Sequence, residues 1–350
     1  MRERPVSDRP VRERAAQGGA VQEGAASDGR SVARRLRGIP RLLARVMWAY
    51  ACSAVLAPVP RIRSATPGAD PCAGSQLAAI YVSYDRSSRL HPHVVDQLRA
   101  LARAGRRVIF ITNSPRLAPE LARTIGPLVR EIVHRRNWGH DFGAFRDGIA
   151  RLGDVSHLQS LLLMNDSCLG PFADLAQVET RAAERGCDLF GITDSLAHAY
   201  HLQTYYLLLT GRVVRSAAFT TFWRALLVSQ PRSMVIFRGE IGFTQAMLRA
   251  GFSAGALCPY ETVARLGAEA ARLRLAQTLP AEDRAHWEKL IARVEAAIPL
   301  NPTHFFWDIL LCPCGSPFLK RDLVERNPAN VAGIEAWHLV VDALPKACGS

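Results

Sequence analysis

The 350-residue sequence has few cysteines, and they do not form the clusters that hold small secreted folds together. Only Cys312 and Cys314 lie close together, and without a second pair this spacing is a weak zinc signal. Sparse cysteines of this kind are typical of a reducing compartment, so we expect a cytoplasmic protein. Aromatic residues make up 7% of the chain, and the 25 glycines and 21 prolines are too few for a collagen-like or low-complexity protein.

Catalytic and nucleotide-binding motifs of several common classes are also missing from the sequence. It contains no nucleophile elbow with a Ser-His-acid pattern and no His/Cys group at the spacing of structural zinc. It also lacks the GxGxxG spacing of dinucleotide sites and the GK[ST] ending of a P-loop. These absences argue against a hydrolase, a zinc module, a dinucleotide-binding enzyme and a P-loop NTPase.

The N-terminal part of the sequence has no hydrophobic run long enough to span a bilayer. The apolar run from Val46 to Val59 has roughly 14 residues, short of the ~20 that a membrane-spanning helix needs. It also begins too late for an ordinary secretory signal. Two interpretations of residues 31–60 stay open: a basic helix on an anionic membrane surface, and a helix packed on the protein body.

Positive charge is concentrated at the N-terminus. Residues 1–64 contain thirteen arginines and five acidic residues, a net +8 of the formal +13. The rest of the chain is nearly balanced, which argues against nucleic-acid binding across the whole protein. An Arg-rich nucleic-acid-binding arm remains as an alternative, and it predicts steeply salt-dependent binding confined to these 64 residues.

Composition divides the chain into four parts. The first 30 residues contain hardly any large apolar residue, so we expect them to be disordered. Prolines 58, 60, 67 and 71 predict a linker before the folded body. The predicted boundaries are 1–30 for the disordered arm, 31–76 for the basic helix and proline-rich linker, 77–330 for the folded domain and 331–350 for a C-terminal tail.

The body alternates between apolar runs of strand length and segments with helical spacing. Predicted helices at 91–105 and 117–126 separate the first runs. This alternation predicts an α/β fold with a mostly parallel sheet flanked by helices, and with ligands at the carboxyl ends of the strands. The predicted strands are 77–85, 106–114, 130–136, 160–167 and 187–195.

Polar residues follow these apolar runs at the point where each predicted strand ends. In an open α/β sheet such positions share one rim, so we expect them to lie near one another. They are Tyr84 and Asp85, Asn113 and Ser114, Asn165 to Ser167, and Asp194 and Ser195.

The segment Arg136 to Ala144, with the sequence RNWGHDFGA, lies between a predicted strand and a predicted helix. Gly139 and Gly143 permit close approach of the backbone to a ligand, while Arg136 and the first amides of the helix suit a diphosphate. Asp141 suits a helix cap or a hydrogen bond to a sugar hydroxyl. A capped tight turn without a ligand is the alternative interpretation.

Asp166 comes straight after a predicted buried strand, where a carboxylate is placed to hold Mg²⁺ or Mn²⁺ between two phosphates. The alternative is an Asx turn that ends the strand. His304, in the sequence NPTH, is a second candidate for a metal or phosphate site, although a histidine in an aromatic patch also fits simple packing.

Glu240 begins a predicted helix over 240–248. Acidic residues are electrostatically favourable at that position, but one beside a buried acceptor site also suits a general base. Asp194 is the second candidate for this role. His201 and Gln203 alternate with apolar residues and are expected to point into the same cleft.

Eight segments in order give a wider resemblance: YVSYD, VIFITNS, RRNWGHDFGAF, LLLMNDSCLGP, HLQTYYLLL, FWRAL, EIGFTQAMLRAG and NPTHFFWDIL…GSPFLKRDLVERNP. From about Leu77 to Pro328 the chain resembles the rhamnan synthesis protein F family. The resemblance implies a GT-A-like, Rossmann-like fold that transfers a sugar, often rhamnose, from a nucleoside diphosphate donor to a lipid-linked or lipopolysaccharide glycan. The expected location is the cytoplasm, and the membrane-surface interpretation of residues 31–60 would put the protein at the inner face of the cell membrane.

The resemblance also implies roles for particular residues. Asn165-Asp166-Ser167 stands where GT-A enzymes have an Asp-x-Asp metal element, but it holds one carboxylate, so the need for Mg²⁺ or Mn²⁺ stays open. The stretch from Asn137 to Gly143 is implied to line the donor pyrophosphate and sugar. Glu240 lies where inverting members place their base. A catalytically inactive sugar-binding or scaffolding protein is the alternative, and the single carboxylate favours it.

Overall fold

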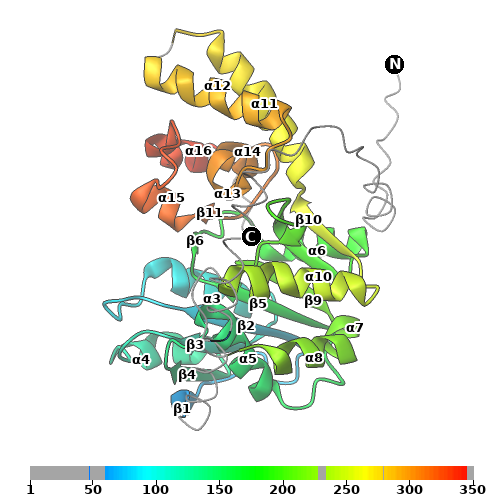
Figure 1. Cartoon of the computed structure of the whole chain (residues 1–350). Helices are drawn as coiled ribbons and strands as arrows, with labels where there is room; N and C mark the ends of the chain where they lie inside the picture. The colour runs from blue at the N-terminus through cyan, green and yellow to red at the C-terminus, as the bar shows by residue number, and fades with distance from the viewer. Residues whose placement is uncertain (1–46, 48–59, 228–233, 279, 345–350) are drawn as a thin grey trace.

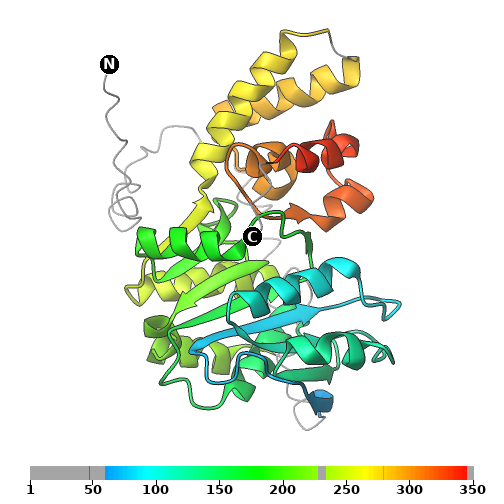
Figure 2. The same ribbon diagram turned by 180° about the vertical axis from the view of Figure 1, so that it is seen from behind.

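The computed structural model describes residue 47 and residues 60–227, 234–278 and 280–344 (Figures 1 and 2). The predicted arm at 1–30 and nearly all of the predicted membrane-surface segment at 31–60 lie outside these residues. Among the helices of the described ranges, none has the length and apolar character needed to cross a bilayer.

A nine-stranded sheet forms the centre of the structure, in the order β1-β4-β3-β2-β5-β9-β7-β10 with β8 paired to β7. The four neighbours β4, β3, β2 and β5 are parallel, and so are β7 and β10. All five predicted strands are present, which confirms the mostly parallel α/β architecture. They are β2 (Leu77–Ser83), β3 (Arg107–Thr112), β4 (Glu131–Arg135), β5 (Ser160–Asn165) and β7 (Leu189–Ser195).

Further strands lie where no strand was predicted. β1 (Ile62–Pro67) lies within the predicted linker and pairs antiparallel with β4 at the sheet edge. Its side chains are largely exposed, so it lacks the apolar run by which the other strands are recognised. β9 (Tyr206–Thr210) runs antiparallel between β5 and β7. The others are β8 (His201–Leu202) and β10 (Ala254–Cys258).

Helices cover both faces of the sheet because successive strand residues point to opposite sides. In β2, Ala79 and Tyr81 face one helical layer, while Ile80 and Val82 face the other. Figure 2 views the first layer, with α3 (Pro92–Arg103), α4 (Leu121–Ile125), the short η1 (Gly126–Leu128) and α6 (Leu175–Arg185). Figure 1 views the second, with α5 (His140–Leu152), α7 (Gly211–Val214), α8 (Ala217–Ala225), the π-helix η2 (Val235–Ile241) and α10 (Gly242–Arg249).

A C-terminal helical lobe stands above the sheet in both views. Its core joins Trp307, Leu311, Leu323 and Ile334. Residues 331–342, predicted as part of a tail, therefore pack within this lobe. The lobe contains α11 (Tyr260–Leu275), α12 (Ala281–Glu295), α13 (Pro302–Phe305), α14 (Trp307–Leu311), α15 (Arg321–Arg326), η3 (Ile334–Ala336) and α16 (Trp337–Asp342).

A two-stranded ribbon fastens the lobe to the sheet. β11 (Leu319–Lys320) pairs antiparallel with β6 (Cys168–Leu169), which follows β5 after a two-residue gap. The backbone N–H of Arg321 donates to the carbonyl of Ser167 at 3.0 Å. The ribbon thereby carries the beginning of α15 to the carboxyl end of the central strand β5.

Candidate functional site

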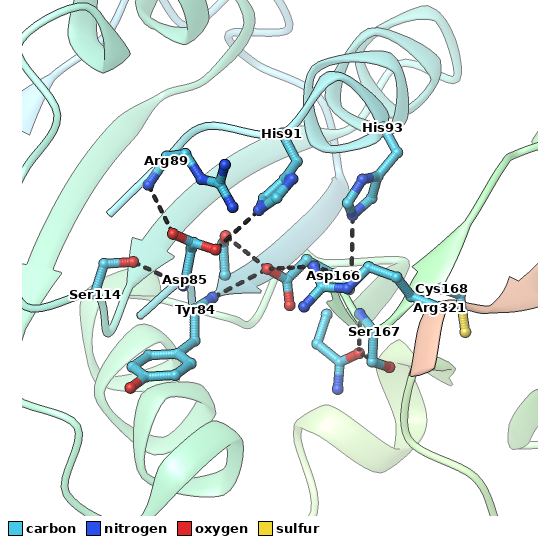
Figure 3. Close-up of polar contacts among 12 residues, drawn as sticks. Tyr84, Asp85, Arg89, His91, His93, Ser114, Asp166, Ser167, Cys168 and Arg321 are labelled. Carbon is cyan, nitrogen blue, oxygen red and sulfur yellow. Dashed lines mark hydrogen bonds and ion pairs between the residues drawn. The ribbon is translucent and has the colours of Figure 1, made fainter. Parts of the chain in front are cut away.

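Asp166 joins the carboxyl ends of two neighbouring strands. Its Oδ2 accepts hydrogen bonds from the Ser83 hydroxyl at 2.8 Å and from the Tyr84 backbone N–H at 3.1 Å (Figure 3). Burial raises the pKa of Asp166, and Arg321 and these two donors partly offset that effect. The ends of β2 and β5 therefore meet at a single carboxylate, as the predicted rim requires.

Asn165 makes the turn that ends β5. Its Oδ1 accepts the backbone N–H of Ser167 at 3.1 Å and the Ser167 hydroxyl at 2.5 Å, which is an Asx turn. The turn considered for Asp166 is thus made by its neighbour, and Asp166 faces β2 instead. The Nδ2 of Asn165 donates to Asp141 Oδ2 at 3.0 Å. This contact brings the start of α5 to the same rim.

The loop before α5 is shaped by two glycines. Gly139 and the next residue, His140, both have positive φ, +75° and +50°. A Cβ on Gly143 would lie 2.2 Å from the Trp138 carbonyl oxygen, so only glycine fits there. The backbone therefore folds tightly onto the first turn of α5, as the tight-turn interpretation predicts, and Asn137 lies exposed beside it. The predicted cap is wrong, because the N-cap residue is Gly139, no side chain caps α5, and Asp141 lies in its first turn.

Arg135, which the sequence analysis passed over, is the fully buried arginine that holds this loop. Its guanidinium donates to Asp147 Oδ2 at 2.9 Å, to Asn113 Oδ1 at 2.9 Å and to the Trp138 carbonyl at 2.8 Å. Burial lowers the pKa of Arg135, and Asp147 opposes that effect. The sequence offers one signal for this role, which is an arginine within the apolar pattern of a predicted strand.

Arg136 lies on the outer side of the same loop. Its Nε donates to the Pro60 carbonyl at 3.3 Å, and its guanidinium lies 5.6 Å from the centre of the Trp138 ring. Because neighbouring strand residues alternate in direction, burial of Arg135 turns Arg136 the other way. In the described part of the chain its contacts are with the β1 edge, away from Asp166.

Glu240 lies within the π-helix η2, which continues into α10, so the prediction that a helix begins at Glu240 is wrong. Its Oε2 accepts the Thr204 backbone N–H at 3.2 Å and the Thr204 hydroxyl at 2.8 Å, and His201 Nε2 lies 3.4 Å from Oε1. Burial favours the neutral acid, but these partners outweigh it and lower the pKa of Glu240. Glu240 is therefore ionised at neutral pH, with a side chain 20% exposed.

A continuous series of contacts connects Glu240 with Asp166. Tyr205, next to Thr204, accepts the backbone N–H of Asn165 on its carbonyl at 3.3 Å. Asn165 is in turn adjacent to Asp166. The structure thus brings Glu240 and Asp166, 74 positions apart in the chain, to the same edge of the sheet.

Asp194 lies at the end of β7, beneath the lobe. Its Oδ1 accepts the backbone N–H of Tyr260, the first residue of α11, at 2.6 Å. Burial raises the pKa of Asp194 to about 6, although the Tyr260 hydrogen bond opposes the shift. This geometry fits an anchor for α11.

The Asp194→Asn variant is expected to be more stable than the wild type at pH 7.5. A carboxyl whose pKa rises from 3.8 to about 6 on folding costs stability when ionised, so the cost appears as the pH rises through this window. Asparagine keeps an oxygen that accepts the Tyr260 N–H, and it removes the charge. The free energy of unfolding is therefore expected to rise by about 1–3 kcal/mol. Urea unfolding at pH 4 and pH 7.5 measures this, and a variant less stable than wild type at pH 7.5 contradicts it.

Tyr84 and Asp85 extend the rim beyond β2 (Figure 3). Asp85 accepts the backbone N–H of Arg89 and a hydrogen bond from His91 Nε2, both at 2.9 Å. Burial opposes ionisation, but His91 and Arg89 outweigh it and lower the pKa of Asp85. The Tyr84 side chain is 37% exposed and is available to a ligand.

His304 is not brought together with Asp166. Its Nε2 lies 3.4 Å from Asp322 Oδ1, and its Nδ1 lies 2.8 Å from Asn301 Nδ2. Across the described ranges, no group of three or more His, Cys, Asp and Glu side chains is placed to hold a metal ion. The donor set at Asp166 is a single carboxylate facing an arginine, which by itself does not make the Mg²⁺ or Mn²⁺ site that the sequence left open.

Two basic residues stand where that cation was expected. Arg321 Nη1 lies 3.9 Å from Asp166 Oδ2 (Figure 3). Lys320 Nζ donates to the Ser167 hydroxyl at 3.0 Å. Neither residue was predicted from the sequence to have a role. The only signal was two consecutive basic residues after the apolar Phe318 and Leu319.

Comparison with known proteins supports the family resemblance over part of the chain. Residues 108–265 match the model of the family described as Rhamnan synthesis protein F. The uncharacterized protein y4gN of Sinorhizobium fredii is 30% identical over 172 residues, which are 48% of this chain and 45% of that protein. The matched region thus spans less than half of this relative.

Similar solved structures are distant. S. aureus TarS in complex with UDP shares 10% identity at a TM-score of 0.30, covering 63% of this chain and 70% of that one. Mannosyltransferase PcManGT from Pyrobaculum calidifontis, in complex with GDP-Man and Mn²⁺, has the same identity and TM-score, covering 89% and 90%.

Proposed function

We propose that this protein is a glycosyltransferase of the GT-A-like type that takes its sugar from a nucleoside diphosphate donor. The observation that carries the proposal is the series of contacts that places Asp166 and Glu240 at one rim, at the carboxyl ends of parallel strands. Ligands of open α/β sheets bind at this edge. The match of residues 108–265 to the rhamnan synthesis family supports rhamnose as the sugar and a cell-surface polysaccharide or lipopolysaccharide as the acceptor.

Glu240 is the proposed general base of a single, inverting displacement. It takes the proton of an acceptor hydroxyl while that oxygen forms a bond to the anomeric carbon. The bond from the same carbon to the diphosphate oxygen breaks, and the nucleoside diphosphate leaves with the electron pair. Thr204 and His201 hold the carboxylate ionised, so it is ready to accept the proton.

The donor side of the proposal lies at Asn137 to Gly143, Asn165 and Ser167, next to the exposed Tyr84. The loop packs tightly on the first turn of α5, and the N-terminus of a helix is a position that suits a diphosphate. Asp141 keeps the role of a ligand for a sugar hydroxyl. Contact of residues 31–60 with the inner face of the cell membrane is proposed for delivery of a lipid-linked acceptor.

Asp166→Ala is expected to weaken donor binding about 10-fold or more. The substitution leaves the Ser83 hydroxyl and the Tyr84 N–H without their buried acceptor, so the loop after β2 loses its position. Calorimetry with dTDP-rhamnose, the first donor of a thermal-shift panel of nucleoside diphosphate sugars, measures the loss. Asp96→Ala, which removes an exposed carboxylate of α3, is the control. Equal affinity in both variants contradicts the proposal.

A catalytically inactive sugar-binding or scaffolding protein is the second candidate function. The single carboxylate of Asn165-Asp166-Ser167 favours it, because GT-A enzymes that use a metal hold it with more than one. Slow hydrolysis of the donor separates the two candidates. A glycosyltransferase releases nucleoside diphosphate from its donor without an acceptor, whereas an inactive binding protein releases none.

A further inference from the structure

Lys320 and Arg321 form a cationic pair at the rim, and the ribbon between β6 and β11 holds it there. Pairing of Lys320 with Cys168 sets its register, and the backbone N–H of Arg321 donates to the Ser167 carbonyl. Lys320 also lies over the Tyr205 ring, with its Nζ 5.4 Å from the ring centre. Both positive charges therefore have fixed places beside the end of β5.

Within the described ranges, carboxylates lie at ion-pair distance from Arg321 alone, and both of these ion pairs are long. Arg321 lies 3.9 Å from Asp166 Oδ2 and 3.5 Å from Glu325 Oε1, whereas Arg135 and Asp147 meet at 2.9 Å in the core. Lys320 has no carboxylate within 4 Å among residues 60–227, 234–278 and 280–344. The charge of Asp322, two positions later, acts on it only from farther away.

The surroundings of the pair leave its positive charge available for a ligand. His93 Nε2 lies 3.2 Å from the Asp166 carbonyl, and burial lowers the pKa of His93, so this ring is neutral at pH 7.5. Asp166 itself is shared between Ser83, Tyr84 and Arg321. The Arg321 side chain is 21% exposed, so part of it faces solvent at the rim.

We propose that Lys320 and Arg321 bind the diphosphate of the donor in the place that a divalent cation occupies in metal-dependent enzymes. This inference rests on the proposed function. Arginine presents paired N–H donors that match phosphate oxygens, and lysine adds a point charge. Fixed positive groups at a departing diphosphate stabilise the charge that develops there as the bond to the sugar breaks. Diphosphate binding is therefore independent of Mg²⁺ and Mn²⁺.

Binding of dTDP and UDP to the full chain, measured by calorimetry with EDTA and with Mn²⁺, tests the inference. The affinity of the wild type is expected to agree within about twofold in the two buffers. Arg321→Met and Lys320→Met are each expected to weaken binding about 10- to 100-fold, the size of a lost charge-assisted hydrogen bond. The same two substitutions are expected to weaken binding of dTMP less than binding of dTDP, because dTMP lacks the second phosphate.

Matched variants separate the pair from general effects of charge. Arg326→Met removes an exposed arginine from the same helix and is expected to leave binding unchanged. Arg321→Lys keeps the charge but loses the paired donors, so it is expected to retain part of the affinity. Thermal unfolding of each variant shows whether it folds. If Arg321→Met does not fold, Arg321→Lys still tests the role of the paired donors.

The outcomes distinguish this inference from the proposed function. Binding of a nucleoside diphosphate only in the presence of Mn²⁺, or full affinity in both methionine variants, overturns the role of the pair and leaves the glycosyltransferase proposal standing. No binding of any nucleoside diphosphate by the wild type, with or without metal, overturns the proposed function itself.

Discussion

Replacing Glu240 with glutamine is expected to lower turnover about 10²- to 10⁴-fold, the usual contribution of a general base. Glutamine still offers a carbonyl oxygen to the Thr204 N–H and hydroxyl, so the π-helix keeps its position. It cannot accept the proton of the acceptor hydroxyl. Steady-state rates with a saturating donor measure the effect.

Donor affinity is the companion measurement for this variant. Because Glu240 serves the acceptor side, donor binding in Glu240→Gln is expected to stay within about twofold of the wild type. Glu269→Gln, which removes an exposed carboxylate of α11, is the control for lost negative charge. Unchanged turnover in Glu240→Gln eliminates Glu240 as the base.

Arg135→Met is expected to lower the free energy of unfolding by about 3–5 kcal/mol, as for other broken buried ion pairs. The variant leaves Asn113 Oδ1 and the Trp138 carbonyl without their donor and takes one partner from Asp147. Arg61 Nε donates to Asp147 Oδ1 at 3.0 Å, so that carboxylate keeps one partner in the variant. The loss of stability is therefore expected near the lower end of this range. Urea unfolding measures the change.

The neighbouring arginine supplies the control for this prediction. Arg136→Met removes a partly exposed side chain on the outer side of the loop, and we expect a loss below about 1 kcal/mol. Equal losses in the two variants contradict the assignment of Arg135 as the residue that holds the loop. Donor affinity is expected to fall in Arg135→Met, since the loop 136–139 loses its anchor.

The sheet was predictable because most of its strands are buried on both faces. Such strands appear in the sequence as nearly continuous apolar runs, and all five predicted ones are present. β1 escaped prediction because it is an exposed edge strand, and its bracketing prolines resemble those of a linker. β9 lies in an apolar segment whose antiparallel insertion between β5 and β7 depends on contacts distant in sequence.

The candidate site was predictable only where it follows from strand order. Strand ends share a rim, so Asp166 and the residues around it were found from their position after apolar runs. The choice between Arg135 and Arg136 depends on which of two neighbouring side chains points inward, and the sequence does not show this. Lys320 reaches Ser167 across 153 positions through a two-stranded ribbon that leaves no pattern in either segment.

In the proposed mechanism the donor binds at the rim between Asp166 and Glu240. A crystal structure of the protein with the nucleoside diphosphate that stabilises it most in the thermal-shift panel tests this directly. We expect the diphosphate within hydrogen-bond distance of Lys320 and Arg321. A nucleotide bound elsewhere, for example at the opposite ends of the strands near Glu131, would contradict it.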